Sequence, residues 1–161
     1  MIVEACLPWN PIPKEFSGCW QVDVVHLEEG FTTENVARNA SVSLAIAAYS
    51  DPTPERPRED RAWRLDFTRC WAYRRRIIGY EGDAPLTRPE TDPHLAFWEI
   101  SPSRFIIESG VQGLYSHAAF HHYVIVAAIH EAYEFVATGW KVERLPDEWA
   151  HPFSNKPFPR W

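Results

Sequence analysis

Histidine and glutamate residues concentrate between positions 117 and 134. Of all segments of the chain, this one has the residue types and spacing most similar to those of a catalytic or metal-binding site. This segment holds His117, His121, His122, His130, Glu131 and Glu134. On a helix, His117 and His121 would lie on one face at a spacing that can share a metal ion. The run from His130 to Glu134 has the beginning of a zinc-protease HExxH motif, but Glu134 replaces its second histidine. A divalent-metal site formed by His121, His130 and Glu134 is therefore one hypothesis.

Other catalytic signatures are missing from the sequence. It has no Gly-x-Ser-x-Gly nucleophile motif, and its glycines are scattered, without the glycine-rich run that a phosphate loop requires. Cys70 follows Arg69, a cation that would lower the pKa of an exposed thiol, although a cysteine where a strand ends is more often a small core residue. We therefore expect no catalytic residue and no cofactor, and the sequence favours a protein that is not an enzyme.

Charge and cysteine content narrow the class of protein. The net charge of −6 and pI near 5.6 argue against general binding of nucleic acid or anionic membranes, while allowing a basic protein partner. Cys6, Cys19 and Cys70 are an odd number without a CxxC pair, so we expect neither a disulfide framework nor a zinc cluster. The sequence shows no signal peptide and no membrane-spanning run. We expect a cytoplasmic protein.

The elements that would position these residues are mostly strands. Apolar and polar residues alternate in segments 19–27, 42–46 and 63–67, and further strands are expected at 71–78 and 97–100. A short helix is expected to begin near Ser101 or Pro102 and to stop at Gly110. Arg74 and Arg76 should lie on one face of their strand and Arg75 on the other. Their expected partners are Asp66, Glu81, Asp83 and Glu99.

Residues 121–144 decide between two fold classes. As a helix, this segment would not have a single apolar stripe, because residues 123–129 are apolar on every side. Val124, Ile125 and Val126 are β-branched and favour a strand. We predict a hairpin with strands 123–129 and 133–144 and a turn at 130–132, in which His130 lies far from His117. The first strand is expected to be covered on both faces. A helix remains the alternative, and only a helix would bring the histidines together.

The predicted fold is one domain, residues 1–161, of class α+β and mainly β. It has a curved antiparallel sheet, a sandwich or a partial barrel, one short helix, and an irregular tail at 146–161 that is rich in proline and aromatic residues. The tail either packs on its own domain or offers its rings to another chain. The aromatic residues expected in the core are Trp63, Phe67, Trp71, Phe97 and Trp98.

Three segments carry a family resemblance. They are RAWRLDFTRCWAYR, FWEISPSRFI and HHYVIVAAIHEAYEFVATGWKVE. In this order they resemble a group of small, β-rich bacterial proteins, which in size and layout resemble immunity proteins of toxin systems. The resemblance covers about the last two-thirds of the chain and implies the fold more than a chemistry. The group usually carries an Asp-Glu pair at the hairpin turn, where this chain has His130 and Glu131.

A second resemblance implies a different fold. The segment from Phe16 to Trp20 resembles the Gly-x-Trp motif of lipocalin-type barrels, with Gly18 and Trp20 in the motif positions. Proline clusters, however, interrupt the regular succession of strands that such an eight-stranded barrel requires. We therefore prefer the sandwich or partial barrel.

Two functions follow from these features. The leading one is a small protein-binding factor, immunity-like or accessory, which binds another protein such as a basic toxin domain. The expected contact residues are Asp51, Glu55, Glu59, Asp60, Glu81, Asp83, Trp149, Phe153, Phe158 and Trp161. The alternative is a small-molecule or metal-binding pocket protein, an enzyme included, that uses the cluster between His117 and Glu134. A homodimer is compatible with both.

Overall fold

The computed structural model describes residues 4–16, 22–31, 40–77, 96–111, 119–127 and 131–150. Its strands are β1 (Ala5–Pro8), β2 (Val22–Phe31), β3 (Ala40–Tyr49), β4 (Asp60–Thr68), β5 (Ala72–Ile77), β6 (Phe97–Ser101), β7 (His121–Ala127), β8 (Glu131–Ala137) and β9 (Gly139–Arg144). The helix α1 spans Arg104–Glu108, and two short 3-10 helices span Lys14–Phe16 and Asp147–Ala150.

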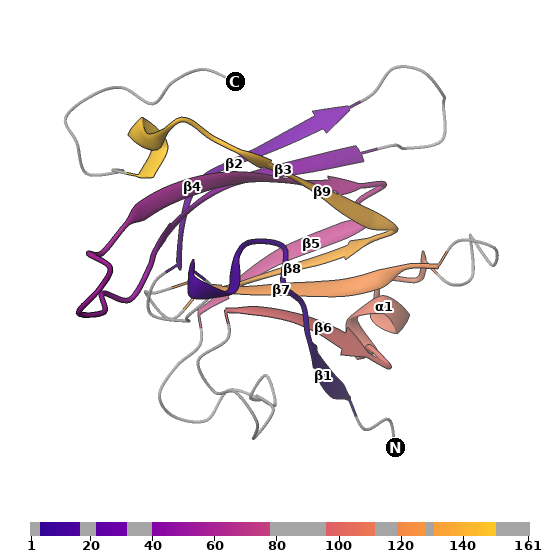
Figure 1. Ribbon diagram of the computed structural model, residues 1–161. Coiled ribbons are helices and arrows are strands. Elements are labelled where there is room, and N and C mark those ends of the chain that lie inside the picture. The colour runs from indigo at the N-terminus through magenta and orange to yellow at the C-terminus, as the bar shows by residue number, and fades with distance from the viewer. Residues whose placement is uncertain are drawn as a thin grey trace.

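The strands form two antiparallel sheets that face each other (Figure 1). One sheet has five strands in the order β1-β6-β7-β8-β5, and the other has four in the order β2-β3-β4-β9. This confirms the predicted α+β, mainly β class and specifies it as a sandwich, without the closed barrel that the lipocalin resemblance implied. Gly18 and Trp20, which carry that resemblance, lie outside the described residues.

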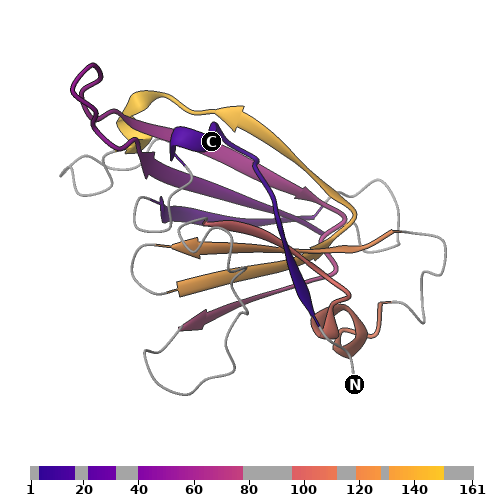
Figure 2. The same cartoon turned by 60° about the horizontal axis from the view of Figure 1, so that its bottom comes forward.

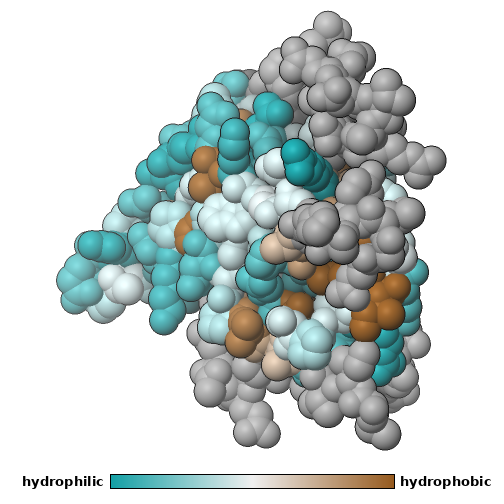
Figure 3. Space-filling model, turned by 90° about the vertical axis from the view of Figure 1, so that its right-hand side faces the viewer, coloured by the Kyte–Doolittle hydropathy of each residue, from teal (hydrophilic) through white to brown (hydrophobic). Residues whose placement is uncertain are grey.

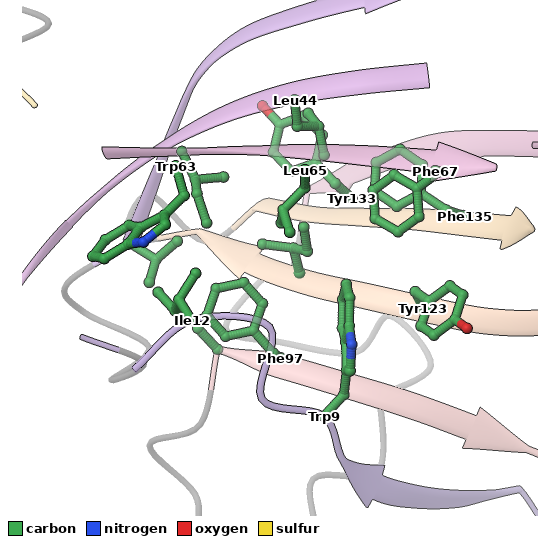
Figure 4. Packing of buried hydrophobic residues seen from close by; sticks show 14 of the residues in the cluster. Trp9, Ile12, Leu44, Trp63, Leu65, Phe67, Phe97, Tyr123, Tyr133 and Phe135 are labelled. Carbon is green, nitrogen blue, oxygen red and sulfur yellow. The ribbon is translucent and has the colours of Figure 1, made fainter. Parts of the chain in front are cut away.

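Rows of side chains from the two sheets meet in the core (Figure 4). In the four-stranded sheet, Val42, Phe67 and Trp140 are cross-strand neighbours. In the five-stranded sheet, Tyr123 and Phe135 are neighbours in the same way. The rings of Phe67 and Phe135 stack, with centroids 4.1 Å apart and planes 8° from parallel. Alternate residues of a strand share a face, so this stacked pair determines which residues of β4 point toward the opposite sheet.

One contact joins the sheets along each side of the sandwich. On one side, the Tyr73 hydroxyl of β5 donates a hydrogen bond to the Glu29 carboxylate of β2. On the other side, Trp9 follows β1 and packs edge-on against Trp140 of β9, with ring centroids 5.4 Å apart. Trp9 also contacts Phe97, so this indole lies between the two sheets.

The five-stranded sheet is buried on both faces at its centre. Every residue of β8 is buried, as is every residue of β7 after His121. On the outer face, Val136 packs with Ile106 and Val111 around helix α1. A second cluster on this face joins Trp98 and Val124. The two-sided burial confirms the expectation of a central strand, and it means that any polar residue on this face needs an internal partner.

The described residues between 121 and 144 form strands, so the helical alternative is wrong, and the expectation of a hairpin is confirmed by the pair β7 and β8. The predicted turn at 130–132 is wrong in part, because Glu131 and Ala132 already belong to β8. The predicted second arm, 133–144, is however not one strand. It is two, β8 and β9, which pair in different sheets on either side of Thr138. Across this junction the core-facing positions change from odd numbers, Phe135 and Ala137, to the even number of Trp140, a change of phase that the single-strand prediction overlooked. Helix α1 begins slightly later than predicted, with Ser103 as N-cap.

The described surface has few large apolar side chains. Those exposed are Leu7, Tyr73, Ile77, Ile107 and Val142. On the side shown in Figure 3, hydrophobic residues show through in several separate places between hydrophilic ones. No helix among the described residues is long and apolar enough to cross a membrane.

Replacing Leu65, which is fully buried in the core, should destabilise the fold far more than replacing an exposed aliphatic residue. We expect Leu65→Ala to lower the free energy of unfolding by about 2–5 kcal/mol, because the cavity removes contacts from both sheets. The matched control is Ile77→Ala, at a side chain that is 74% exposed, with an expected loss of less than about 1 kcal/mol. Urea unfolding measures both, and equal losses would contradict the described core.

Candidate functional site

A buried carboxylate, Glu134, lies on the outer face of the five-stranded sheet. It belongs to β8, where alternate residues face the core, and its own position points the other way, toward α1. Its two oxygens accept hydrogen bonds from the guanidinium groups of Arg74 and Arg76 on the neighbouring strand β5. Arg74 is directly opposite Glu134 in the register, and Arg76 is one alternation further along. The pairing of β5 with β8 therefore supplies both cations.

His122 lies beside this ion pair and is 2% exposed. Its Nε2 atom is 3.6 Å from Oε1 of Glu134, an electrostatic contact slightly longer than a hydrogen bond. Its Nδ1 atom is 2.8 Å from Oγ of Ser103, the N-cap of α1, which accepts a hydrogen bond from the backbone N–H of Ile106. In the tautomer that carries its proton on Nε2, toward the carboxylate, Nδ1 accepts a hydrogen bond from the Ser103 hydroxyl. The helix is thereby connected to the sheet.

The electrostatics of this group favour the ionised carboxylate. Burial alone would raise the pKa of Glu134, but His122, Arg74 and Arg76 outweigh burial and lower this pKa to about 2. The carboxylate is therefore charged throughout the physiological range. Both of its oxygens are occupied by arginines, which leaves little capacity for a metal ion.

Ser103, His122 and Glu134 have the residue types of a hydrolase triad, but their arrangement is that of a structural network. In a triad, the serine oxygen is accessible and is activated by the histidine. Here Ser103 is 5% exposed and its oxygen caps a helix. Phe105 packs edge-on against the His122 ring at a centroid distance of 5.3 Å. We assign these three residues to holding α1 on the sheet.

The third arginine of the run lies on the opposite face of β5, as predicted. Arg75 donates to the Glu131 carboxylate, which also accepts from the Tyr133 hydroxyl at 2.8 Å. The hydrogen bond from Arg75 lowers the pKa of Glu131, and burial raises the pKa of Tyr133 to about 12. The predicted partners were wrong where the structure describes them. Asp66 pairs with Arg64, and Glu99 pairs with His121, while Glu81 and Asp83 lie outside the described residues.

The predicted metal ligands do not converge in the described structure. His121 points to the opposite face of the sheet from its neighbour His122, and its Nδ1 atom lies 2.5 Å from Glu99. Glu134 belongs to the arginine cluster instead. His117 and His130 lie outside the described residues. Within the described ranges, no three histidine, cysteine or acidic side chains are grouped so that they could hold a metal ion.

Cys70 is a buried core residue, and the alternative of an activated thiol is wrong. Burial, with a smaller contribution from the charge of Glu29, raises the pKa of this thiol to about 12. The core includes Cys70 among its members. A thiol with such a pKa is almost entirely protonated near neutral pH and is a poor nucleophile.

The predicted contact residues separate into exposed, buried and undescribed groups. Asp51, Glu55 and Glu59 are exposed on the hairpin that joins β3 to β4, and Asp60 is partly exposed where β4 begins. Trp149 is 3% exposed and packs against Ala45 and Ala62, so the start of the tail folds back onto its own domain. The remaining members, Glu81, Asp83, Phe153, Phe158 and Trp161, lie outside the described residues.

The sequence did not predict that Arg74, Arg76, His122 and Glu134 form one cluster. Alternation places Arg74 and Arg76 on one face of β5. It also places His122 of β7 and Glu134 of β8 on the outer face of the sheet. The missing information was that β5 pairs with β8, strands separated by more than fifty residues. The signal that was present is a glutamate inside an otherwise apolar strand, because a buried carboxylate requires a cation.

Comparisons with protein-family models, with curated proteins and with solved structures found no match for this chain.

We expect Glu134→Gln to destabilise the protein by about 3 kcal/mol at neutral pH, because it leaves Arg74 and Arg76 without their carboxylate. Because the folded pKa of Glu134 is lowered from 4.5 to about 2, its contribution is present above the unfolded pKa and is lost as the pH falls through this range. The difference between wild type and variant should therefore shrink between pH 4.5 and about 2. Urea unfolding at several pH values measures it.

The matched control is Glu148→Gln, which neutralises an exposed carboxylate and should leave stability nearly unchanged. A wild-type advantage over Glu134→Gln that stays constant down to about pH 2 would contradict the assigned ion pair.

Proposed function

We propose that this protein is a non-catalytic binding factor, immunity-like or accessory, that recognises the basic surface of another protein through the β3–β4 hairpin. A basic toxin domain is the kind of partner that the sequence resemblance suggests. The observation that supports this proposal best is the exposed but ordered hairpin of residues 50–60. It extends beyond the two sheets at the left of Figure 1 and at the upper left of Figure 2.

Backbone hydrogen bonds give this hairpin a definite shape. Thr53 and Arg56 exchange two of them, at 2.8 and 3.1 Å. At its base, the Ser50 N–H donates to the carbonyl of Glu59, and the Glu59 N–H donates to the Ser50 hydroxyl, both at 2.9 Å. Prolines at positions 52, 54 and 57 further restrict the backbone. The charged side chains are therefore held on a partly rigid support.

The hairpin contributes little to the core, because residues 51–59 are all exposed. Ordering a segment costs conformational entropy, and in this hairpin no burial of apolar side chains offsets the cost. A preorganised loop does, however, bind a partner with a smaller entropy loss than a flexible one. We take this as the support for a recognition role.

Within the hairpin, we assign the contact with the partner to two carboxylates near the tip. Glu59 and Asp60 face arginines of the same segment, with Arg61–Glu59 at 3.0 Å and Arg58–Asp60 at 3.1 Å. Asp51 and Glu55 lie nearer the tip, and we place them in contact with the partner. Carboxylates in such a position accelerate the approach of a basic surface and disfavour acidic ones.

Charge reversal on the hairpin tests the proposal. Immobilised full-length protein should retain one dominant partner in stoichiometric amount from extracts of the cells that express it. The double variant Asp51→Lys/Glu55→Lys should retain at least tenfold less, because two attractive contacts become repulsive. Glu15→Lys, which reverses the charge of one exposed carboxylate in the first 3-10 helix, is the control and should retain as much as wild type.

Failure to retain any partner would contradict protein binding. Equal retention by wild type and the double variant would contradict the hairpin as the contact surface. Unfolding curves of all three proteins verify that each is folded.

A further inference from the structure

Strand β9 is an edge strand with an open side. It pairs with β4 on one side only, and no described strand pairs with the other. It lies at the outer edge of its sheet in Figure 2. Its residues from Lys141 to Arg144 are all exposed. Unpaired strand edges invite pairing with another chain unless something protects them.

Two of the other edge strands, β1 and β2, have protective features that β9 lacks. Strand β1 has only four residues and ends in a proline, and β2 has a register shift between Val24 and His26. Strand β9 pairs with β4 in an uninterrupted register of six residues and contains no proline.

The sequence of β9, Gly-Trp-Lys-Val-Glu-Arg, is complementary to itself when read in the antiparallel direction. With Val142 opposite Val142 of a second copy, Lys141 lies opposite Glu143, and Glu143 lies opposite Lys141. Trp140 then lies opposite Arg144, a pair that can form a cation–π contact. Lysine on an edge strand ordinarily prevents pairing, but here the second copy supplies the opposite charge in this register.

The backbone direction agrees with this register. The Leu145 N–H donates to the carbonyl of Ala62 on β4, so the backbone polar groups at odd positions of this segment point toward β4. Those of Trp140, Val142 and Arg144 consequently point to the open edge, because the direction alternates along an antiparallel strand. In the proposed register these residues are opposite one another, which allows about six backbone hydrogen bonds between the copies.

Charges on the outer face of the sheet extend the complementarity. Within one chain, Asp66 of β4 is opposite Lys141, and Arg64 of β4 is opposite Glu143. When a second copy is added, negative and positive side chains alternate in rows across the two four-stranded sheets that are joined at β9. Lys141 and Glu143 would thus each have an opposite charge on either side.

We propose that two copies of this chain associate through β9, antiparallel about a two-fold axis at Val142, to form one continuous eight-stranded sheet. The strand is short, so the dimer is reversible and depends on concentration. The association uses the edge of the four-stranded sheet and leaves both β3–β4 hairpins exposed, so it is independent of the partner-binding role proposed above.

Sedimentation velocity over a wide range of concentrations tests this dimer. Wild type should shift from monomer to dimer as concentration rises. Lys141→Glu creates two like-charged pairs of glutamates across the axis, and Glu143→Lys creates two pairs of lysines, so each variant alone should dimerise at least tenfold more weakly.

A mixture of the two variants provides the decisive comparison. In the mixed dimer, the glutamates of one chain face the lysines of the other, so association should recover toward the wild-type level. Wild type that stays monomeric, variants that dimerise as well as wild type, or a mixture that does not recover would each overturn the proposal. Urea unfolding of each variant verifies that the monomer is folded.

Discussion

The contact between the two sheets at Phe67 and Phe135 is the constraint on which the rest of the structure depends. A strand that slips by one residue exchanges its inward and outward side chains, so a stacked pair joining β4 to β8 sets which residues of both strands are buried. Phe67 also faces Trp9 and Tyr123, with ring centroids 5.9 and 5.8 Å away, which brings the N-terminal segment and β7 into the same arrangement. Many small aromatic contacts thereby reinforce a single register.

That register has a consequence for the polar residues. It places Phe135 inward and therefore Glu134 outward, beneath α1, on a face that is also buried. A carboxylate in this place is tolerable only with cations, which β5 supplies through Arg74 and Arg76. His122 and Ser103 continue the network into the N-cap of the helix. Of the residues that first suggested a chemical site, His122 and Glu134 are thus explained by the way in which a sheet buried on both faces accommodates charge.

Local patterns predicted the strands well, because alternation and β-branched residues act through near neighbours. The strands at 63–67 and 97–100, the two-faced burial of β7, and the opposite directions of Arg74 and Arg75 all follow from the period of two. Contacts between distant segments could not be predicted in this way. The change of sheet at Thr138, the pairing of β5 with β8 and the distribution of strands between two sheets each depend on tertiary packing, and the partners of the arginines were wrong for that reason.

The β3–β4 hairpin and the edge of β9 both belong to a framework that is held together by the stacked pair Phe67 and Phe135. A double-mutant cycle at these two residues therefore tests the described alignment of the sheets most directly. The free energy of unfolding would be measured for wild type, Phe67→Leu, Phe135→Leu and the double variant. We expect the two substitutions to be coupled by about 0.5–1.5 kcal/mol, because the stacked rings stabilise each other. Strictly additive losses would contradict the contact and, with it, the described alignment of the two sheets.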